Sequence, residues 1–179
     1  FDVVSFTGSA ETARIIRSHP AVAQRSVRCN IEADSLNSAL LDPAASEGGE
    51  AFQLLVKEVV REMTVKSGQK CTAIRRVFVP RALYAATAAA IGARLAKTTV
   101  GNPRNEATRM GALVSREQFD NVVAGIAHLQ TEAETLYDGR AATLVDADAA
   151  VAACVAPVLL GTQNPVGAKV LHEVEVFGP

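Results

Sequence analysis

An α/β fold with a largely parallel sheet is the class that the sequence predicts. Three observations lead to it. Strand-like segments alternate with helical stretches along the chain, turns containing glycine or proline separate them, and 49% of the 179 residues are hydrophobic, which is enough for a buried core. The sequence has no internal repeats and no low-complexity tract beyond its richness in alanine. We therefore expect one domain or parts of two.

The first segment predicts a strand, a tight turn and a helix. Residues 1–6 read as a buried strand, Thr7-Gly8-Ser9 forms the turn, and Ser9 stands where an N-cap belongs before a helix over residues 10–18. His19-Pro20 is expected to end that helix. Such a unit presents backbone N–H groups and the positive end of a helix dipole to an anion, although many such turns only connect a strand to a helix.

The middle of the chain predicts a long amphipathic helix. Its apolar residues recur at steps of three and four over residues 50–66, and Gly68 follows where a helix terminator is expected. The segment Ser115-Arg116-Glu117-Gln118 matches a capping box and opens another helix, which we expect to run to about Glu134. The remaining expectations are strands at 26–32, 75–79, 155–160 and 170–177, a helix at 81–97, and turns or loops at 33–37, 46–49, 100–103 and 162–167.

Charge and cysteine usage exclude several functional classes. Eighteen basic against 19 acidic residues leave no polybasic surface for nucleic acid or anionic lipid. No segment reaches the length of a membrane span, and no signal peptide is visible. Three widely spaced cysteines and three scattered histidines argue against a disulfide framework and a metal site, and fit a reducing cytoplasm. Because the chain starts within a strand, we expect it to be an internal piece of a larger protein.

Cys71 is the candidate nucleophile. It lies in the small-residue turn Ser67-Gly68-Gln69-Lys70-Cys71-Thr72-Ala73, between the amphipathic helix and a strand, where its thiol can meet an electrophile. The alternative is a buried structural thiol. Nucleophilic chemistry needs the thiolate, and Lys70, Arg75 and Arg76 are near enough in sequence to supply a favourable field.

Two glutamates are candidates for further roles. Glu32 ends an apolar strand, and partial burial would raise its pKa enough for it to act as a general base; the alternative is a solvated strand-end carboxylate. Glu175, in Glu-Val-Phe-Gly-Pro, is either an exposed carboxylate or a group that holds a sugar hydroxyl.

The order of these motifs resembles the aldehyde dehydrogenase superfamily. Phe6-Thr7-Gly8-Ser9 is followed by a glutamate 23 residues beyond Ser9, by Gly-Gln-x-Cys 39 residues beyond that glutamate, by Gly101-Asn102-Pro103 with Met110-Gly111, and by Glu-x-Phe-Gly-Pro. The resemblance covers the whole chain. It implies an aldehyde dehydrogenase-like fold, with the end of a Rossmann-like cofactor domain at residues 1–33 and most of the α/β catalytic domain at 34–179.

The resemblance also implies roles for individual residues. Cys71 would attack the aldehyde to give a thiohemiacetal and then a thioester, with its own backbone N–H as one oxyanion donor, and Glu32 would activate the water that hydrolyses the thioester. Thr7, Gly8 and Ser9 would lie near the cofactor pyrophosphate, Glu175 at the nicotinamide ribose and Phe177 beside the nicotinamide ring. Arg76 matches a family arginine of structural role.

One departure from the family pattern points to a particular branch. The family usually follows its general-base glutamate with Leu-Gly-Gly, whereas this chain has Glu32-Ala33-Asp34-Ser35-Leu36-Asn37, so the backbone approaches the nicotinamide differently. This segment, with Arg61-Glu62-Met63-Thr64 and the sequence around Cys71, resembles a branch that oxidises CoA-linked semialdehydes in the aerobic degradation of aromatic acids. The implied cofactor is NADP, with NAD as the alternative.

The substrate and the reaction leave alternatives open. The resemblance implies 3,4-dehydroadipyl-CoA semialdehyde of benzoate breakdown, or the semialdehyde of the phenylacetate pathway, and a cytoplasmic homodimer as the parent protein. A CoA-acylating dehydrogenase is a further alternative, against which the presence of Glu32 argues. A structural relative that has lost catalysis is the non-enzyme alternative. We expect the 179-residue piece alone to be inactive, because most of the dinucleotide fold lies outside it.

Overall fold

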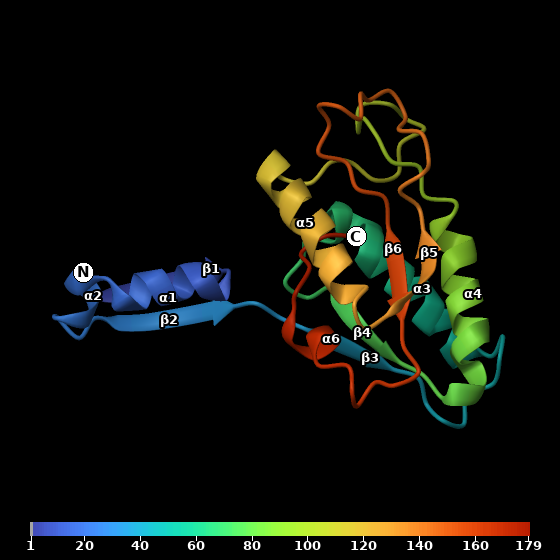
Figure 1. The fold of residues 1–179 in the computed structure, drawn as a ribbon, viewed down its shortest axis with the longest axis horizontal. Helices are drawn as coiled ribbons and strands as arrows, with labels where there is room; N and C mark the ends of the chain where they lie inside the picture. Colours follow the sequence, from blue (N-terminus) through green and yellow to red (C-terminus); the bar gives the residue numbers. More distant parts are fainter. Residues whose placement is uncertain (1) are drawn as a thin grey trace. The chain divides into compact units, whose positions relative to one another are not determined.

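The computed structural model describes residues 2–179, which divide into two compact units, Phe1–Ser35 and Leu36–Pro179. Phe1, the first residue of the predicted strand 1–6, lies outside the described residues. Each unit combines helices with strands, and two of the three two-stranded sheets are parallel (Figure 1). The predicted α/β class is confirmed.

The first unit is a parallel strand pair with a connecting helix. β1 (Val3–Gly8) leads into α1 (Ala10–Ser18), the short α2 (Pro20–Ala23) follows, and β2 (Arg28–Ala33) pairs with β1. The predicted cap is confirmed, because Ser9 Oγ accepts a hydrogen bond from the N–H of Thr12. Pro20 ends α1 as expected but also begins α2, since the first helical position needs no N–H.

The start of β2 differs from the sequence prediction. The strand begins at Arg28 rather than at Ser26 because Ser26 has a φ of 50°, which is left-handed backbone outside the strand region.

The second unit begins with a strand that the sequence did not predict. β3 (Asn37–Leu40) pairs in parallel with β4 (Ile74–Phe78). The turn predicted for residues 33–37 is therefore wrong at Asn37, which belongs to the strand. The pairing explains the difference: Asn37 Nδ2 donates to the carbonyls of Cys71 (2.7 Å) and Ala73 (3.1 Å), which draws this polar residue to the start of a sheet.

Helices follow each of these strands. Between β3 and β4 lie α3 (Glu50–Thr64) and the 3₁₀ segment η1 (Val65–Gly68), and after β4 come η2 (Arg81–Leu83) and α4 (Tyr84–Leu95). The amphipathic helix is confirmed, although it ends at Thr64, two residues before the predicted end.

The last part of the chain contains the largest differences from the sequence prediction. α5 (Arg116–Leu129) is confirmed with its Ser115 cap but is shorter than expected, because the residues after it form β5 (Glu134–Asp138), which pairs antiparallel with β6 (Val158–Gly161). The predicted strand at 170–177 is wrong. Its first residues form α6 (Val170–Glu173), with the N–H of Val170 bound to Glu132 Oε2 at 2.7 Å, and residues 174–179 are not paired with any described strand.

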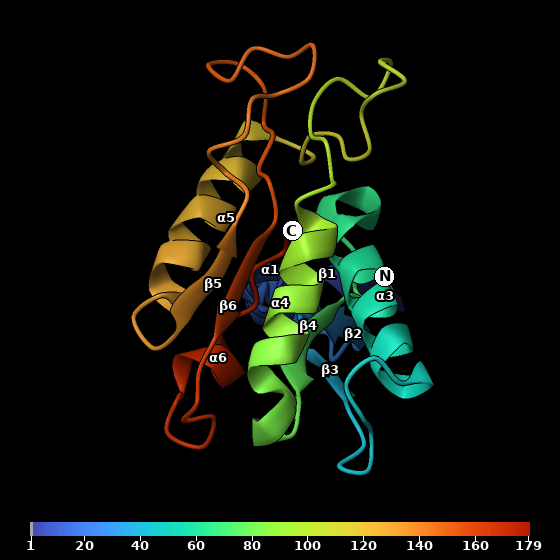
Figure 2. The same cartoon turned by 90° about the vertical axis from the view of Figure 1, so that its right-hand side faces the viewer.

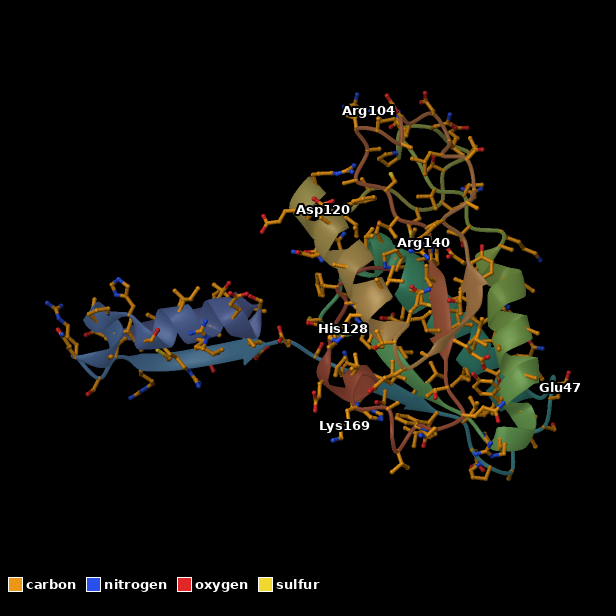
Figure 3. The ribbon with its side chains drawn as sticks, in the orientation of Figure 1. Glu47, Arg104, Asp120, His128, Arg140 and Lys169 are labelled. Carbon is orange, nitrogen blue, oxygen red and sulfur yellow. The ribbon has the colours of Figure 1, made fainter. Side chains whose placement is uncertain are left out.

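The hydrophobic core lies in the second unit. One cluster joins α3 to α4, which lie side by side in Figure 2, and a second joins α5 to β6. A third, smaller cluster surrounds Met110. Charged side chains such as Arg104, Asp120 and Lys169 lie on the periphery of this unit (Figure 3). Among the described residues, no helix is both long and apolar enough to cross a membrane.

Candidate active site

The turn that carries Cys71 is shaped by left-handed backbone. Lys66 and Ser67 both have a φ of 54°, and Gly68 has a φ of 69°. A Cβ atom at Gly68 would collide with the carbonyl of Gly178, so glycine is required both by conformation and by this close approach. The reversal ends α3 and leaves Cys71 exposed, as the candidate nucleophile requires.

Several side chains hold this turn in place. Asn37 Nδ2 binds the carbonyl of Cys71 itself, and the buried Ser67 donates its hydroxyl to the carbonyl of Gly111 at 2.9 Å. Gln69 Oε1 accepts from the N–H of Val114 at 3.0 Å. The thiol is therefore accessible while the backbone beneath it is fixed from both directions, which is the arrangement a nucleophile needs.

The three neighbouring cations have partners of their own. Lys70 Nζ lies 2.7 and 2.8 Å from the two carboxylate oxygens of Glu62, so its charge is largely balanced there. Arg76 donates to the carbonyl of Leu36 at 2.6 Å and to His172 Nδ1 at 3.1 Å. Since arginine only donates, His172 Nδ1 accepts, and its Nε2–H donates to Pro165. Arg76 thus links three segments, which fits the structural role that the resemblance implies.

Arg75 joins the Cys71 turn to the Glu175–Phe177 segment. Its guanidinium donates to the carbonyls of Gly68 at 2.6 Å and Gly178 at 2.8 Å, and lies over the Phe177 ring at 5.4 Å from the centroid. Burial lowers the pKa of Arg75, and the charges of Glu175 and Glu62 oppose that fall. The structure therefore brings three of the predicted site residues, Cys71, Glu175 and Phe177, to one region.

Gln118 supports the same segment. The N–H of Gln118 donates to Ser115 Oγ at 3.0 Å, which forms the Ser115 half of the capping box, and the Gln118 side chain donates through Nε2 to the carbonyl of Phe177 at 2.8 Å. The N-terminal turn of α5 thus holds the residue that the resemblance places beside the nicotinamide.

The other predicted site residues gather in the first unit. Thr7 stands opposite Glu32 and Gly8 opposite Ala33 in the β1–β2 register, so the turn and the predicted general base lie together at the carboxyl edge of a parallel pair. That edge is where α/β sheets bind ligands. Glu32 is exposed, however, and the expected partial burial of its carboxylate is wrong for the described chain.

Asp34 occupies part of the same edge. Its Oδ1 accepts from the N–H of Ala10, at the start of α1, at 3.0 Å, and its φ of 48° is one that glycine adopts more readily. A carboxylate thus binds the first amide of the helix, at a position where the family pattern has glycine.

Several supporting residues were not found by sequence reasoning. Glu62, Asn37 and Gln118 act on the turn or on Phe177 from 8, 34 and 59 residues away in sequence, and no local pattern predicts these contacts. Among residues 2–179, no group of three histidine, cysteine or acidic side chains is arranged to hold a metal ion. A cavity of about 320 Å³ between β4, β6, α4 and α5 is largely apolar, and none of the predicted site residues lines it.

Comparison with known proteins decides the family. The model of the aldehyde dehydrogenase family matches residues 1–179. The chain belongs to the aldehyde dehydrogenase family. It is 54% identical, over 179 residues, to 3,4-dehydroadipyl-CoA semialdehyde dehydrogenase of Aromatoleum evansii, a match that covers 99% of this chain and 35% of that protein.

Solved structures of aldehyde dehydrogenases share the fold. Betaine aldehyde dehydrogenase from Staphylococcus aureus, solved in complex with NAD⁺, superposes with a TM-score of 0.83 at 23% identity, covering 99% of this chain and 33% of that one. Proline utilization A from Bradyrhizobium japonicum gives a TM-score of 0.78 at 26% identity, covering 100% and 17%. The chain thus spans about a third of the length of the aldehyde dehydrogenase relative from Aromatoleum, and the expected aldehyde dehydrogenase fold is confirmed.

Proposed function

We propose that the protein containing this chain oxidises an aldehyde to a carboxylic acid with NAD(P)⁺, through a covalent intermediate on Cys71. The observation that carries the proposal is the exposed Cys71 on a backbone turn that is held in two ways: side chains of β3 and β4 bind its carbonyls, and its own Ser67 and Gln69 side chains bind the backbone of the 111–114 loop. Membership of the aldehyde dehydrogenase family supports the reaction class.

The chain's own residues perform the two halves of the reaction. The Cys71 thiolate adds to the aldehyde carbonyl carbon, and the π electrons move to the oxygen, which the Cys71 N–H stabilises. NADP⁺, with NAD⁺ as the alternative, supplies the two-electron acceptor when bound. The acyl group is then held on Cys71 as a thioester. Glu32 takes a proton from water, the water oxygen attacks the thioester carbonyl, and the C–S bond breaks to return the thiolate and release the acid.

The residues of the first unit fit a dinucleotide in part. The exposed turn Thr7–Ser9 lies at the carboxyl edge of the β1–β2 pair and at the N-terminus of α1, which suits a phosphate group. Asp34 already binds the N–H of Ala10, so a phosphate would meet a negative charge there. We assign Thr7, Gly8 and Ser9 to the pyrophosphate, and Glu175 and Phe177 to the nicotinamide ribose and ring.

For the substrate we propose a CoA-linked semialdehyde, 3,4-dehydroadipyl-CoA semialdehyde. The 54% identity with the Aromatoleum protein of that name supports this choice. The alternatives are the semialdehyde of the phenylacetate pathway and a CoA-acylating reaction, in which CoA would replace water; Glu32 favours water. A cytoplasmic homodimer remains a prediction.

The test is NADPH formation by the full-length protein at saturating NADP⁺. The enzyme is offered 3,4-dehydroadipyl-CoA semialdehyde and a simple aliphatic aldehyde side by side. We expect a strong preference for the CoA substrate. Equal or better turnover of the simple aldehyde would keep the dehydrogenase reaction and overturn the substrate proposal, and no turnover of either would overturn both.

A further inference from the structure

Arg75 has more links to the candidate site than its place in the sequence suggests. It lies on β4, next to Arg76, and the family resemblance assigns no role to it. One terminal nitrogen binds the carbonyl of Gly68, three residues before Cys71, and the other binds the carbonyl of Gly178, next to Phe177. These acceptors are 110 residues apart in sequence (178 − 68), so the guanidinium joins two remote segments.

We propose that Arg75 is a positioning residue that sets the placement of the Cys71 turn against the segment carrying Glu175 and Phe177. The inference rests on the proposed function, in which Cys71 attacks the aldehyde and the other two residues contact the nicotinamide end of the cofactor.

The geometry around Arg75 requires a planar cation with two separate donors. The backbone of Gly68 approaches Gly178 so closely that even a methyl group would collide, and the guanidinium bridges the two carbonyls at this contact. The same group lies over the face of Phe177, where a cation is attracted by the ring. Lysine carries its three N–H donors on one nitrogen and has no planar face, so it cannot reproduce two donors on separate nitrogens together with a flat contact to the ring.

The electrostatic surroundings support the same role. Glu175 and Glu62 both favour the charged form of Arg75, and Glu62 also pairs with Lys70, the residue before Cys71. Arg75 is half-buried, and its charge is attracted both by Glu175 of the C-terminal segment and by Glu62 of α3, which pairs with the residue before Cys71. A displacement of the turn by about 1 Å would change the rate by as much as 100-fold, because the thiol and the hydride acceptor must meet the same carbon.

Arg76 offers a matched control. It has the same charge, lies on the same strand, is likewise half-buried, and binds Leu36 and His172 instead of the two segments. We would compare Arg75→Lys with Arg76→Lys in the full-length protein. Amide hydrogen exchange is measured over 66–71 and 175–178, and KM for NADP⁺ and kcat are measured with a simple aliphatic aldehyde.

Arg75→Lys should accelerate exchange in both segments together, raise the KM for NADP⁺ and lower kcat, each by about tenfold. Arg76→Lys should leave both segments protected, even if it lowers Tm equally. The proposal is overturned if Arg75→Lys lowers Tm while exchange and both kinetic constants stay within about twofold of wild type. Absence of turnover in the wild type would overturn the proposed function alone, because the exchange comparison would still decide whether Arg75 joins the two segments.

Discussion

The two units of the chain contrast in how much of their structure is buried. The second unit, Leu36–Pro179, contains all three hydrophobic clusters, whereas Ala13 is the one buried hydrophobic residue of the described part of the first unit. Yet each holds a group of candidate site residues, Cys71 with Glu175 and Phe177 in one, and Thr7–Ser9 with Glu32 in the other. Side-chain hydrogen bonds to remote segments hold the group around Cys71 in the second unit. Strand register and a helix cap place the group around Thr7–Ser9 and Glu32 in the first unit.

The two groups have different roles in the proposed reaction, covalent chemistry at Cys71 and phosphate binding at the turn Thr7–Ser9. Covalent chemistry needs a backbone that does not move, and side-chain hydrogen bonds to remote segments hold the backbone around Cys71. A turn that presents amides to a phosphate depends on local geometry, which β1, the Ser9 cap and the start of α1 provide.

The largest expected effect is the loss of the nucleophile. Cys71→Ala in the full-length protein should abolish NADPH formation, by more than about 1,000-fold, because no thioester can form. The affinity for NADP⁺, measured by calorimetry, should change little, since the phosphate contacts that we propose belong to the first unit. Loss of cofactor binding would instead show that Cys71 is a structural thiol.

The next effect tests the contribution of the first unit to chemistry. Glu32→Gln should slow thioester hydrolysis by about 100-fold, because glutamine cannot accept the proton of water. Rapid-mixing measurements should then show a burst of NADPH followed by a slow steady state. An unchanged steady-state rate would remove Glu32 from the role of base.

Truncating one side chain in each unit tests the contrast in burial between the units. Leu95 is 0% exposed and Ile15 is 54% exposed. Leu95→Ala should lower the free energy of unfolding of the 179-residue chain by about 2–5 kcal/mol, through lost burial and a cavity. Ile15→Ala should change it by less than about 0.5 kcal/mol. Urea denaturation measures both, and equal losses would contradict the contrast.

A smaller effect concerns the carboxylate at the start of α1. Asp34→Asn keeps an oxygen for the N–H of Ala10 but removes the charge, so the KM for NADP⁺ should fall by about threefold in the full-length protein. Asp34→Glu, which retains the charge, is the control. A higher KM in Asp34→Asn would mean that the charge assists cofactor binding.

The smallest expected effect is a difference in reactivity between two thiols of the second unit, Cys71 and Cys154. Burial raises the pKa of Cys154, so less of it is thiolate at a given pH, and its alkylation should shift to higher pH. Cys71, which is exposed, should react with iodoacetamide first between pH 7 and 8, as peptide mass spectrometry can show. Faster labelling of Cys154 would contradict the burial assigned to it.

The sequence predicted correctly those features that depend on residues close to one another in the chain. The caps at Ser9 and Ser115 follow from one side chain and one nearby N–H, and the periodicity of α3 follows from its own apolar residues. β5 and the last segment were missed because their conformations depend on distant partners. β5 is placed by β6, and α6 starts where the N–H of Val170 meets Glu132.

The sequence by itself determined the α/β class, the family motifs and the position of Cys71 in a turn after a helix, because these depend on neighbours within a few residues. Only the tertiary structure decided which residues support that turn. Asn37 and Arg75 act through bonds to atoms far along the chain, and Arg75 reaches Gly178 across 103 residues. Such contacts depend on how β3, β4 and the C-terminal segment pack together, and periodicity and spacing carry no information about that packing.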